Sequence, residues 1–195
     1  MKNKDATVIK CLIEKKHEEM NILKISKELR MDYKNIYSII KRLEKESLIK
    51  LESFGHSCRI NLVAQVHPVF FEAEYIRKKE LLKNKNIAVM LNDFRNAISS
   101  KLYIMLIFGS YAKNTHGPNS DIDLMFIVPE EKTEKFEKEI AIVSKTLPLP
   151  IHSLVFSERE FLEMARAKSS NVGLEAIKNN VILYGIENYY ELVKG

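Results

Sequence analysis

The sequence predicts an α+β protein of 195 residues, with a helical N-terminal domain and a C-terminal α/β domain that contains a mixed sheet. Two observations predict this division. In the first third, apolar residues recur every three or four positions, as they do on the buried face of a helix. In the remainder, short apolar runs of strand length carry two closely spaced acidic residues, Asp121 and Asp123. We expect domains at 1–66 and 85–195, joined by a helical linker at 67–84.

Composition excludes several classes of protein. The apolar fraction of 46% is ordinary for a globular chain. No apolar run approaches the ~20 residues that a membrane-spanning helix needs, so we expect no membrane association. The start, Met-Lys-Asn-Lys-Asp, leads into an amphipathic stretch rather than the apolar core of an export signal, which predicts a cytoplasmic protein. Cys11 and Cys58 have no metal-ligand spacing and are expected to be buried, unpaired side chains.

The net charge of +5 is concentrated in the first domain. Residues 1–66 hold 14 of the 31 Lys and Arg residues but only 9 of the 26 Asp and Glu residues. The rest of the chain is therefore neutral, with 17 residues of each sign. Such an asymmetry indicates that the first domain binds a polyanion, although a basic face that only meets solvent would give the same count.

The N-terminal domain is expected to contain three helices and a β-hairpin, at residues 5–18, 22–29, 33–45, 48–53 and 58–63. Asp32 precedes the third helix and is its expected N-cap, because a short carboxylate accepts from the first free N–H groups. The hairpin turn, Phe54-Gly-His-Ser57, contains the glycine that a short loop favours.

One face of the third helix carries groups that suit contact with DNA. Ile36, Ile40 and Leu43 form its inner stripe. The outer side chains can bind phosphates and the edges of bases: Lys34, Asn35, Tyr37, Ser38, Lys41 and Lys45.

This order of elements resembles the winged helix-turn-helix domains of prokaryotic transcription regulators. Ser47 stands where those domains more often have glycine. The resemblance implies binding of double-stranded DNA, with Arg59, Lys50 and His56 on the wing, and a homodimer on a palindromic site. Winged helices also serve as dimerisation or protein-docking modules, which remains an alternative here.

The linker is expected to form a helix at Phe70–Leu82, followed by a helix at Ile87–Ile98. The aromatic side chains of the first of these are expected to pack against protein rather than ligand.

The most informative pattern lies at residues 103–128. An apolar run, Tyr103 to Phe108, ends at Gly109-Ser110, and after ten residues Asp121 and Asp123 open a second apolar run that ends at Val128. Side chains two positions apart on a strand share a face, so the two carboxylates are expected side by side. Such a pair favours a hard divalent cation. Gly109-Ser110, at the start of an expected helix, offers N–H groups and a helix dipole to phosphate.

This motif resembles that of the nucleotidyltransferases of the DNA polymerase beta superfamily, and most closely their minimal prokaryotic members. The resemblance covers roughly residues 85–190 and implies a nucleoside triphosphate, most often ATP, as substrate. It assigns Gly109, Ser110 and Lys113 to nucleotide binding. Asn114 stands where glycine is common in relatives, and Asn tolerates the left-handed conformation expected there nearly as well. It assigns Asp121 and Asp123 to catalysis and to Mg²⁺, with Mn²⁺ as the alternative ion. The reaction is attack on the α-phosphorus with release of pyrophosphate.

The sequence departs from the superfamily at one position. Active members supply a third carboxylate from a later strand, expected here at Leu149–Phe156, which contains no Asp or Glu. His152 or Ser153 occupies that position, and imidazole is a poor ligand for Mg²⁺. Glu158 and Glu160 follow at the start of a helix. They could replace the third carboxylate only if the backbone brought them close to Asp121 and Asp123.

Three functions are therefore open. The first is a DNA-binding nucleotidyltransferase that modifies a small acceptor or a protein, such as a partner toxin, since the family includes antitoxins. The second is a transcription regulator whose nucleotidyltransferase-like domain senses nucleotide with little or no turnover. The third is a pair of interaction modules in which Asp121 and Asp123 have lost their role.

Overall fold

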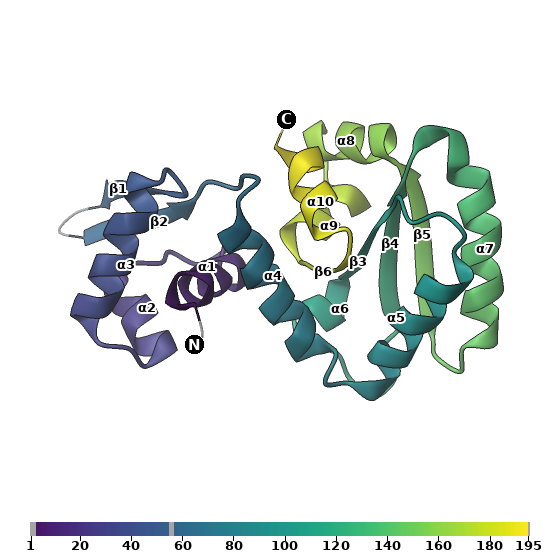
Figure 1. Cartoon of the computed structure of the whole chain (residues 1–195), viewed down its shortest axis with the longest axis horizontal. Helices are drawn as coiled ribbons and strands as arrows, with labels where there is room; N and C mark the ends of the chain where they lie inside the picture. Colours follow the sequence, from purple (N-terminus) through teal and green to yellow (C-terminus); the bar gives the residue numbers. More distant parts are fainter. Residues whose placement is uncertain (1–2, 55–56, 195) are drawn as a thin grey trace. The chain divides into compact units, whose positions relative to one another are not determined.

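The computed structural model describes residues 3–54 and 57–194 (Figure 1). Gly55 and His56, at the tip of the expected hairpin, lie outside the described residues. The chain forms two compact units, one extending to Arg77 and the other running from Lys78 to Val193. Their division falls within a single helix, α4 (Pro68–Leu81). Among the described residues, no helix has both the length and the apolar character needed to cross a membrane.

The first unit contains the three helices and the hairpin in the expected order. Its elements before α4 are α1 (Lys4–Glu14), α2 (Ile22–Leu29), α3 (Tyr33–Lys45), β1 (Ile49–Phe54) and β2 (Ser57–Leu62). Helix α1 ends four residues before the predicted end. The chain turns there, with the N–H of Glu18 donating to the carbonyl of Lys15, and then buries Met20. The carbonyl of Met20 accepts a hydrogen bond of 2.9 Å from the N–H of Ile60, so the segment after α1 is held against β2.

Helix α3 has the predicted cap and inner face. The Asp32 carboxylate accepts from the N–H groups of Lys34 and Asn35, which leaves two fewer unsatisfied donors at the helix start. The buried residues of α3 are Ile36, Ile39, Ile40 and Leu43.

The exit from α3 passes through a residue in the left-handed conformation, which glycine adopts most easily. Ser47 has φ +59°, in the left-handed region, and the next N–H, from Leu48, donates to the carbonyl of Leu43. Leu48 is thereby buried and begins the path into β1.

Strands β1 and β2 pair antiparallel, from Ile49 opposite Leu62 to Phe54 opposite Ser57, as the hairpin prediction requires (Figure 1). Cys11 is buried, but Cys58 on β2 is exposed, so the expectation that both are buried was wrong. Cys58 shares a face of β2 with the buried Ile60, two residues further on, but it lies closer to the turn of the hairpin, where it is exposed.

The second unit is built around a four-stranded sheet in the order β5-β4-β3-β6. From Lys78 onward its elements after α4 are α5 (Lys85–Ala97), β3 (Ile104–Phe108), α6 (Gly109–Ala112), β4 (Ile122–Val128), a 3-10 turn (Glu130–Lys132), α7 (Thr133–Thr146), β5 (Ile151–Ser157), α8 (Glu158–Arg166), α9 (Val172–Lys178), β6 (Asn180–Tyr184) and α10 (Ile186–Val193). Strand β3 is antiparallel to both of its neighbours, whereas β4 and β5 are parallel. The sheet is therefore mixed, as predicted.

Helices cover the sheet in a way that fixes which side chains of β4 are buried. Ile122, Leu124 and Phe126 belong to one apolar core with residues of α5 and α7, such as Phe94 and Phe136. Helices α8, α9 and α10 contact β3, β4 or β5 as well. Because neighbouring residues of a strand point to opposite faces, Asp123 projects away from the core that holds Ile122 and Leu124.

The strained backbone at Ser47 predicts that Ser47→Gly stabilises the chain. Glycine removes the penalty of a side chain at positive φ, so we expect the free energy of unfolding to rise by about 0.5–1 kcal/mol. Urea unfolding of the full chain, followed by circular dichroism, measures this. The matched control is Glu46→Gly, one residue earlier at φ −81°, which should destabilise instead. A Ser47→Gly variant no more stable than Glu46→Gly would contradict the prediction.

Candidate active site

The two halves of the motif predicted at residues 103–128 meet at one edge of the four-stranded sheet, the edge formed by the end of β3 and the starts of β4 and β5. Strand β3 ends at Phe108, which pairs with Asp123 near the start of β4. On the other side of β4, Asp123 pairs with His152 near the start of β5. The N–H of Ile122 donates to the carbonyl of Pro150 over 2.7 Å, which holds the beginnings of β4 and β5 together. Gly109, Asp123 and His152 are thus brought to the same edge.

Gly109 occupies a position that no other residue fits. Its φ is +65°, which L residues rarely adopt. A Cβ built on Gly109 would overlap Oδ2 of Asp123 and would lie 3.3 Å from Asp123 Cγ. The Asp123 carboxylate therefore lies directly against the backbone of Gly109, in the space that any side chain would fill.

The helix expected after Gly109 is a single turn, α6, of four residues. Its dipole is correspondingly small, and what it offers an anion is chiefly the free N–H groups of its first residues. The N–H of Lys113 closes the turn on the carbonyl of Gly109, and Asn114 follows at φ +55°. This confirms the expectation that Asn114 adopts a left-handed conformation in place of glycine.

Lys113, the predicted cation for the triphosphate, is held by a carboxylate that the sequence did not single out. Its Nζ lies 2.6 Å from Oε1 of Glu175 on α9. The hydrogen bond from Lys113 holds the pKa of the Glu175 carboxyl below its ordinary value. Both side chains are about two-fifths exposed, so the pair is open to solvent and to competing anions. The two residues are 62 positions apart, and no local pattern marks such a partner.

Strand β5 supplies His152 rather than an acid at the position next to Asp123. Its Nδ1 lies 3.4 Å from Oδ1 of Asp123, and the imidazole is more than half exposed. Ser153 turns the other way, with its hydroxyl 3.5 Å from that of Ser144 on α7. Of the two residues that could stand in for the third carboxylate, His152 is the one that faces Asp123.

Asp121 is exposed and lies one residue before β4. The loop that leads to it is shaped by a turn in which Ser120 Oγ accepts from the N–H of Gly117, and by stacking of His116 on Tyr111 with ring centroids 4.0 Å apart. In the part of the chain that the structure describes, no group of three or more His, Cys, Asp or Glu side chains is arranged to hold a metal ion.

Glu158 and Glu160 cannot replace the missing third acid. They follow Ser157 at the end of β5, whereas Asp123 and His152 lie at the starts of their parallel strands. At ~3.3 Å per residue, the length of β5 separates the two ends. The Glu160 carboxylate is also engaged, because it accepts from the N–H and hydroxyl of Ser157 in a capping box.

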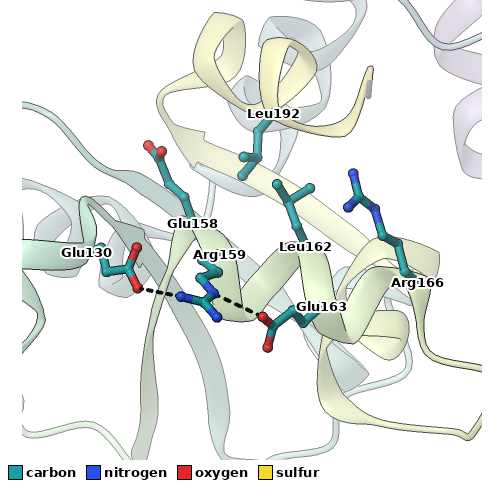
Figure 2. A pocket seen from close by; sticks show the side chains of 7 residues that line it. All are labelled: Glu130, Glu158, Arg159, Leu162, Glu163, Arg166 and Leu192. Atoms are coloured by element: carbon teal, nitrogen blue, oxygen red, sulfur yellow. Dashed lines mark hydrogen bonds and ion pairs between the residues drawn. The ribbon is translucent and has the colours of Figure 1, made fainter.

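The end of β5 instead borders an open pocket of about 450 Å³ (Figure 2). In it, Arg159 lies between two carboxylates, 3.8 Å from Glu130 and 3.0 Å from Glu163. Leu162 and Leu192 form its apolar wall. This pocket is at the opposite edge of the sheet from Asp123, so it does not belong to the candidate active site.

In the first unit, the residues predicted to meet DNA lie on an accessible surface. The outer side chains of α3 are all exposed: Lys34, Asn35, Tyr37, Ser38, Lys41 and Lys45. Lys41 pairs with Glu44 over 2.8 Å, and Arg59 on β2 lies 3.6 Å from Glu19. Exposed pairs of this kind are weak, so the cations can exchange partners.

Comparison with known proteins agrees with the geometry of the second unit. Residues 91–177 match the family model described as "Nucleotidyltransferase domain". No curated protein matches the chain. A solved structure described as "Crystal structure of the toxin-antitoxin with AMP-PNP" is 22% identical, covers 56% of this chain and 79% of its own, and has a TM-score of 0.34. The matched segment contains Gly109, Asp121 and Asp123, and residues 91–177 of this chain form a nucleotidyltransferase domain.

Proposed function

We propose that the protein is a DNA-binding nucleotidyltransferase that transfers a nucleoside monophosphate, from ATP, to a small acceptor or a protein hydroxyl, with release of pyrophosphate. The observation that carries this proposal is the contact between Gly109 and Asp123. A glycine at positive φ, with a carboxylate in the space of its absent side chain, places an acid beside the backbone at the start of α6. This arrangement suits the binding of a metal-bound triphosphate. A turn with only a structural role would not require a carboxylate against the glycine.

The residues at this edge have distinct roles in the proposed reaction. The N–H groups and hydroxyl at Ser110 bind phosphate oxygens, and Lys113 contributes positive charge once it leaves Glu175. Asp121 and Asp123 would hold the divalent cation, and their hard oxygen donors, with Asp123 partly exposed, fit such an ion. A divalent cation bound there would neutralise charge on the triphosphate and so favour attack at the α-phosphorus. The acceptor oxygen forms a bond to the α-phosphorus while the bond to the bridging oxygen of the β-phosphate breaks. Pyrophosphate leaves, and the proton of the hydroxyl passes to water.

The DNA-binding part of the proposal rests on the first unit. Its excess of basic residues, its order of three helices and a hairpin, and the exposed face of α3 support a winged helix-turn-helix role. In this role α3 lies in the major groove, while Arg59 and Lys50 on the hairpin contact the backbone. Binding to a palindromic site would use a homodimer.

A second function is favoured by the composition of β5. The strand contains no Asp or Glu, and His152 stands beside Asp123 where an acid would complete the site. A site with two carboxylates can bind a metal-bound triphosphate but supports the chemical step less well. The alternative is therefore a transcription regulator that senses nucleotide through this domain.

The decisive experiment is incubation of the full chain with ATP labelled at the α-phosphate, in Mg²⁺ or Mn²⁺, with candidate acceptor proteins. Transfer of label together with release of pyrophosphate is expected for the enzyme. Nucleotide binding without either product would favour the sensor. An absence of nucleotide binding in both ions would exclude both functions.

Replacing one carboxylate by its amide tests the metal site. Asp121→Asn or Asp123→Asn should abolish the metal-dependent rise in Tm that ATP produces, because a charged ligand is lost. Without metal, Tm should be unchanged or slightly higher, since repulsion between the two carboxylates is relieved. Thermal unfolding with and without ATP and Mg²⁺ measures both effects. Equal stabilisation of the double variant and the parent would show that the carboxylates do not hold the ion.

Adding one methyl group at Gly109 tests the contact on which the proposal rests. Gly109→Ala must displace the Asp123 carboxylate, and we expect transfer activity to fall about 100-fold, as for other displacements of ~1 Å at a reacting centre. Gly117→Ala is the matched control, because a Cβ there meets nothing closer than Ser120 Oγ at 4.0 Å. Transfer rate and ATP-dependent Tm should be unchanged in the control. Similar losses in both variants would mean that the loop, and not the contact with Asp123, is responsible.

Binding of DNA is expected to depend on the charge and identity of side chains on α3. Lys34→Ala should weaken binding to all DNA sequences alike. It should also reduce the slope of log K against log salt concentration by about one, because one fewer counterion is released. Asn35→Ala should instead alter the preferred sequence, because Asn can bond to base edges. Lys138→Ala on α7 removes the same charge from the second unit as a control. Fluorescence anisotropy over a range of salt distinguishes these effects, and equal weakening by Lys34→Ala and Lys138→Ala would contradict the assignment.

A further inference from the structure

Because β4 pairs with β5, an imidazole nitrogen of His152 lies next to the Asp123 carboxylate. The two strands are parallel and in register, with Asp123 opposite His152, so their side chains rise from the same face of the sheet. The next residue of β5, Ser153, points toward α7. The side chain that β5 offers to this edge is therefore an imidazole.

The Asp123 carboxylate lies between two partners and uses a different oxygen for each. Its Oδ2 lies against the backbone of Gly109, and its Oδ1 is 3.4 Å from Nδ1 of His152. The His152 side chain is 61% exposed and that of Asp123 is 30% exposed, so an ion can reach the space between them from solvent.

The separation of these two atoms suits two ligands of one small cation. With bonds of ~2.1 Å, neighbouring ligand atoms lie ~3.0 Å apart in an octahedral shell and ~3.4 Å apart in a tetrahedral one. Little movement of either side chain is then needed for both to contact the same ion. The remaining positions are left for water and the phosphates of a nucleotide.

We propose that His152 is a metal ligand together with Asp123, and that this mixed nitrogen and oxygen site selects a first-row transition-metal ion over Mg²⁺. The proposal rests on the proposed function, because it concerns the ion that accompanies the triphosphate. Mg²⁺ prefers oxygen ligands and gives up its water reluctantly, so an imidazole contributes little to its binding. Imidazole binds Mn²⁺, Fe²⁺, Co²⁺ and Zn²⁺ with increasing strength along the series. A neutral imidazole in place of a third carboxylate also lowers the negative charge that would attract Mg²⁺.

The test measures Mn²⁺ binding to the full chain directly, by electron paramagnetic resonance, both alone and with a non-hydrolysable ATP analogue. Pulsed measurements should detect coupling of bound Mn²⁺ to an imidazole nitrogen. His152→Gln should remove that coupling and weaken Mn²⁺ binding about tenfold or more, the loss seen even for outer partners of metal ligands. His152→Asp should also remove the coupling but should raise the affinity for Mg²⁺, measured by its competition with Mn²⁺. Both substitutions are at an exposed side chain, so the fold should tolerate them.

His116→Gln is the matched control, because His116 is another exposed imidazole of the same unit and lies in the loop that leads to Asp121. The coupling should persist in this variant. The inference is overturned if wild-type protein binds Mn²⁺ without nitrogen coupling, if coupling survives in His152→Gln, or if His116→Gln removes it. Failure of the proposed function would give a different result. The labelled-ATP assay would then show no transfer with any ion, although the nitrogen coupling to bound Mn²⁺ would remain. Transfer without nitrogen coupling would reject only the role of His152.

Discussion

The site depends on the register of β4 between its two neighbours. Phe108 and His152 both pair with Asp123, so a single position in the middle of three strands sets the distances at this edge. A shift of one residue would turn Asp123 into the core and put Ile122 or Leu124 at its partly exposed position. The apolar contacts of Ile122, Leu124 and Phe126 with α5 and α7 oppose such a shift. The hydrophobic core therefore determines the position of a charged group that it does not touch.

Features encoded within a few residues could be predicted from the sequence. Asp32 caps α3, Asn114 takes a left-handed conformation, and the alternation around Ile122 places Asp123 outside the core. Each of these follows from the chemistry of one residue and its immediate neighbours. The expected strands and helices of the second unit fall within a few residues of the observed ones for the same reason, since the apolar runs were clear.

Features set by pairing between distant segments could not be predicted in this way. The sequence left open whether His152 or Ser153 faces the carboxylates, because that choice depends on the register of β5 against β4. Glu158 and Glu160 could be excluded only once the direction of β5 was known. The pairing of Lys113 with Glu175 depends on where α9 packs. The buried position expected for Cys58 was wrong, because the core covers Ile60 on the same face of β2 but does not extend to Cys58 near the turn.

The ion pair between Lys113 and Glu175 has a consequence for which anions this edge can retain. Any phosphate group that approaches Lys113 must compete with a carboxylate already 2.6 Å from its Nζ. A monoanion gains little by this exchange, whereas a triphosphate can contact several donors at once and offset the loss of Glu175. The ion pair therefore favours anions with a high density of negative charge over monoanions. A ligand with several adjacent negative groups should therefore be retained at this edge more readily than a single phosphate.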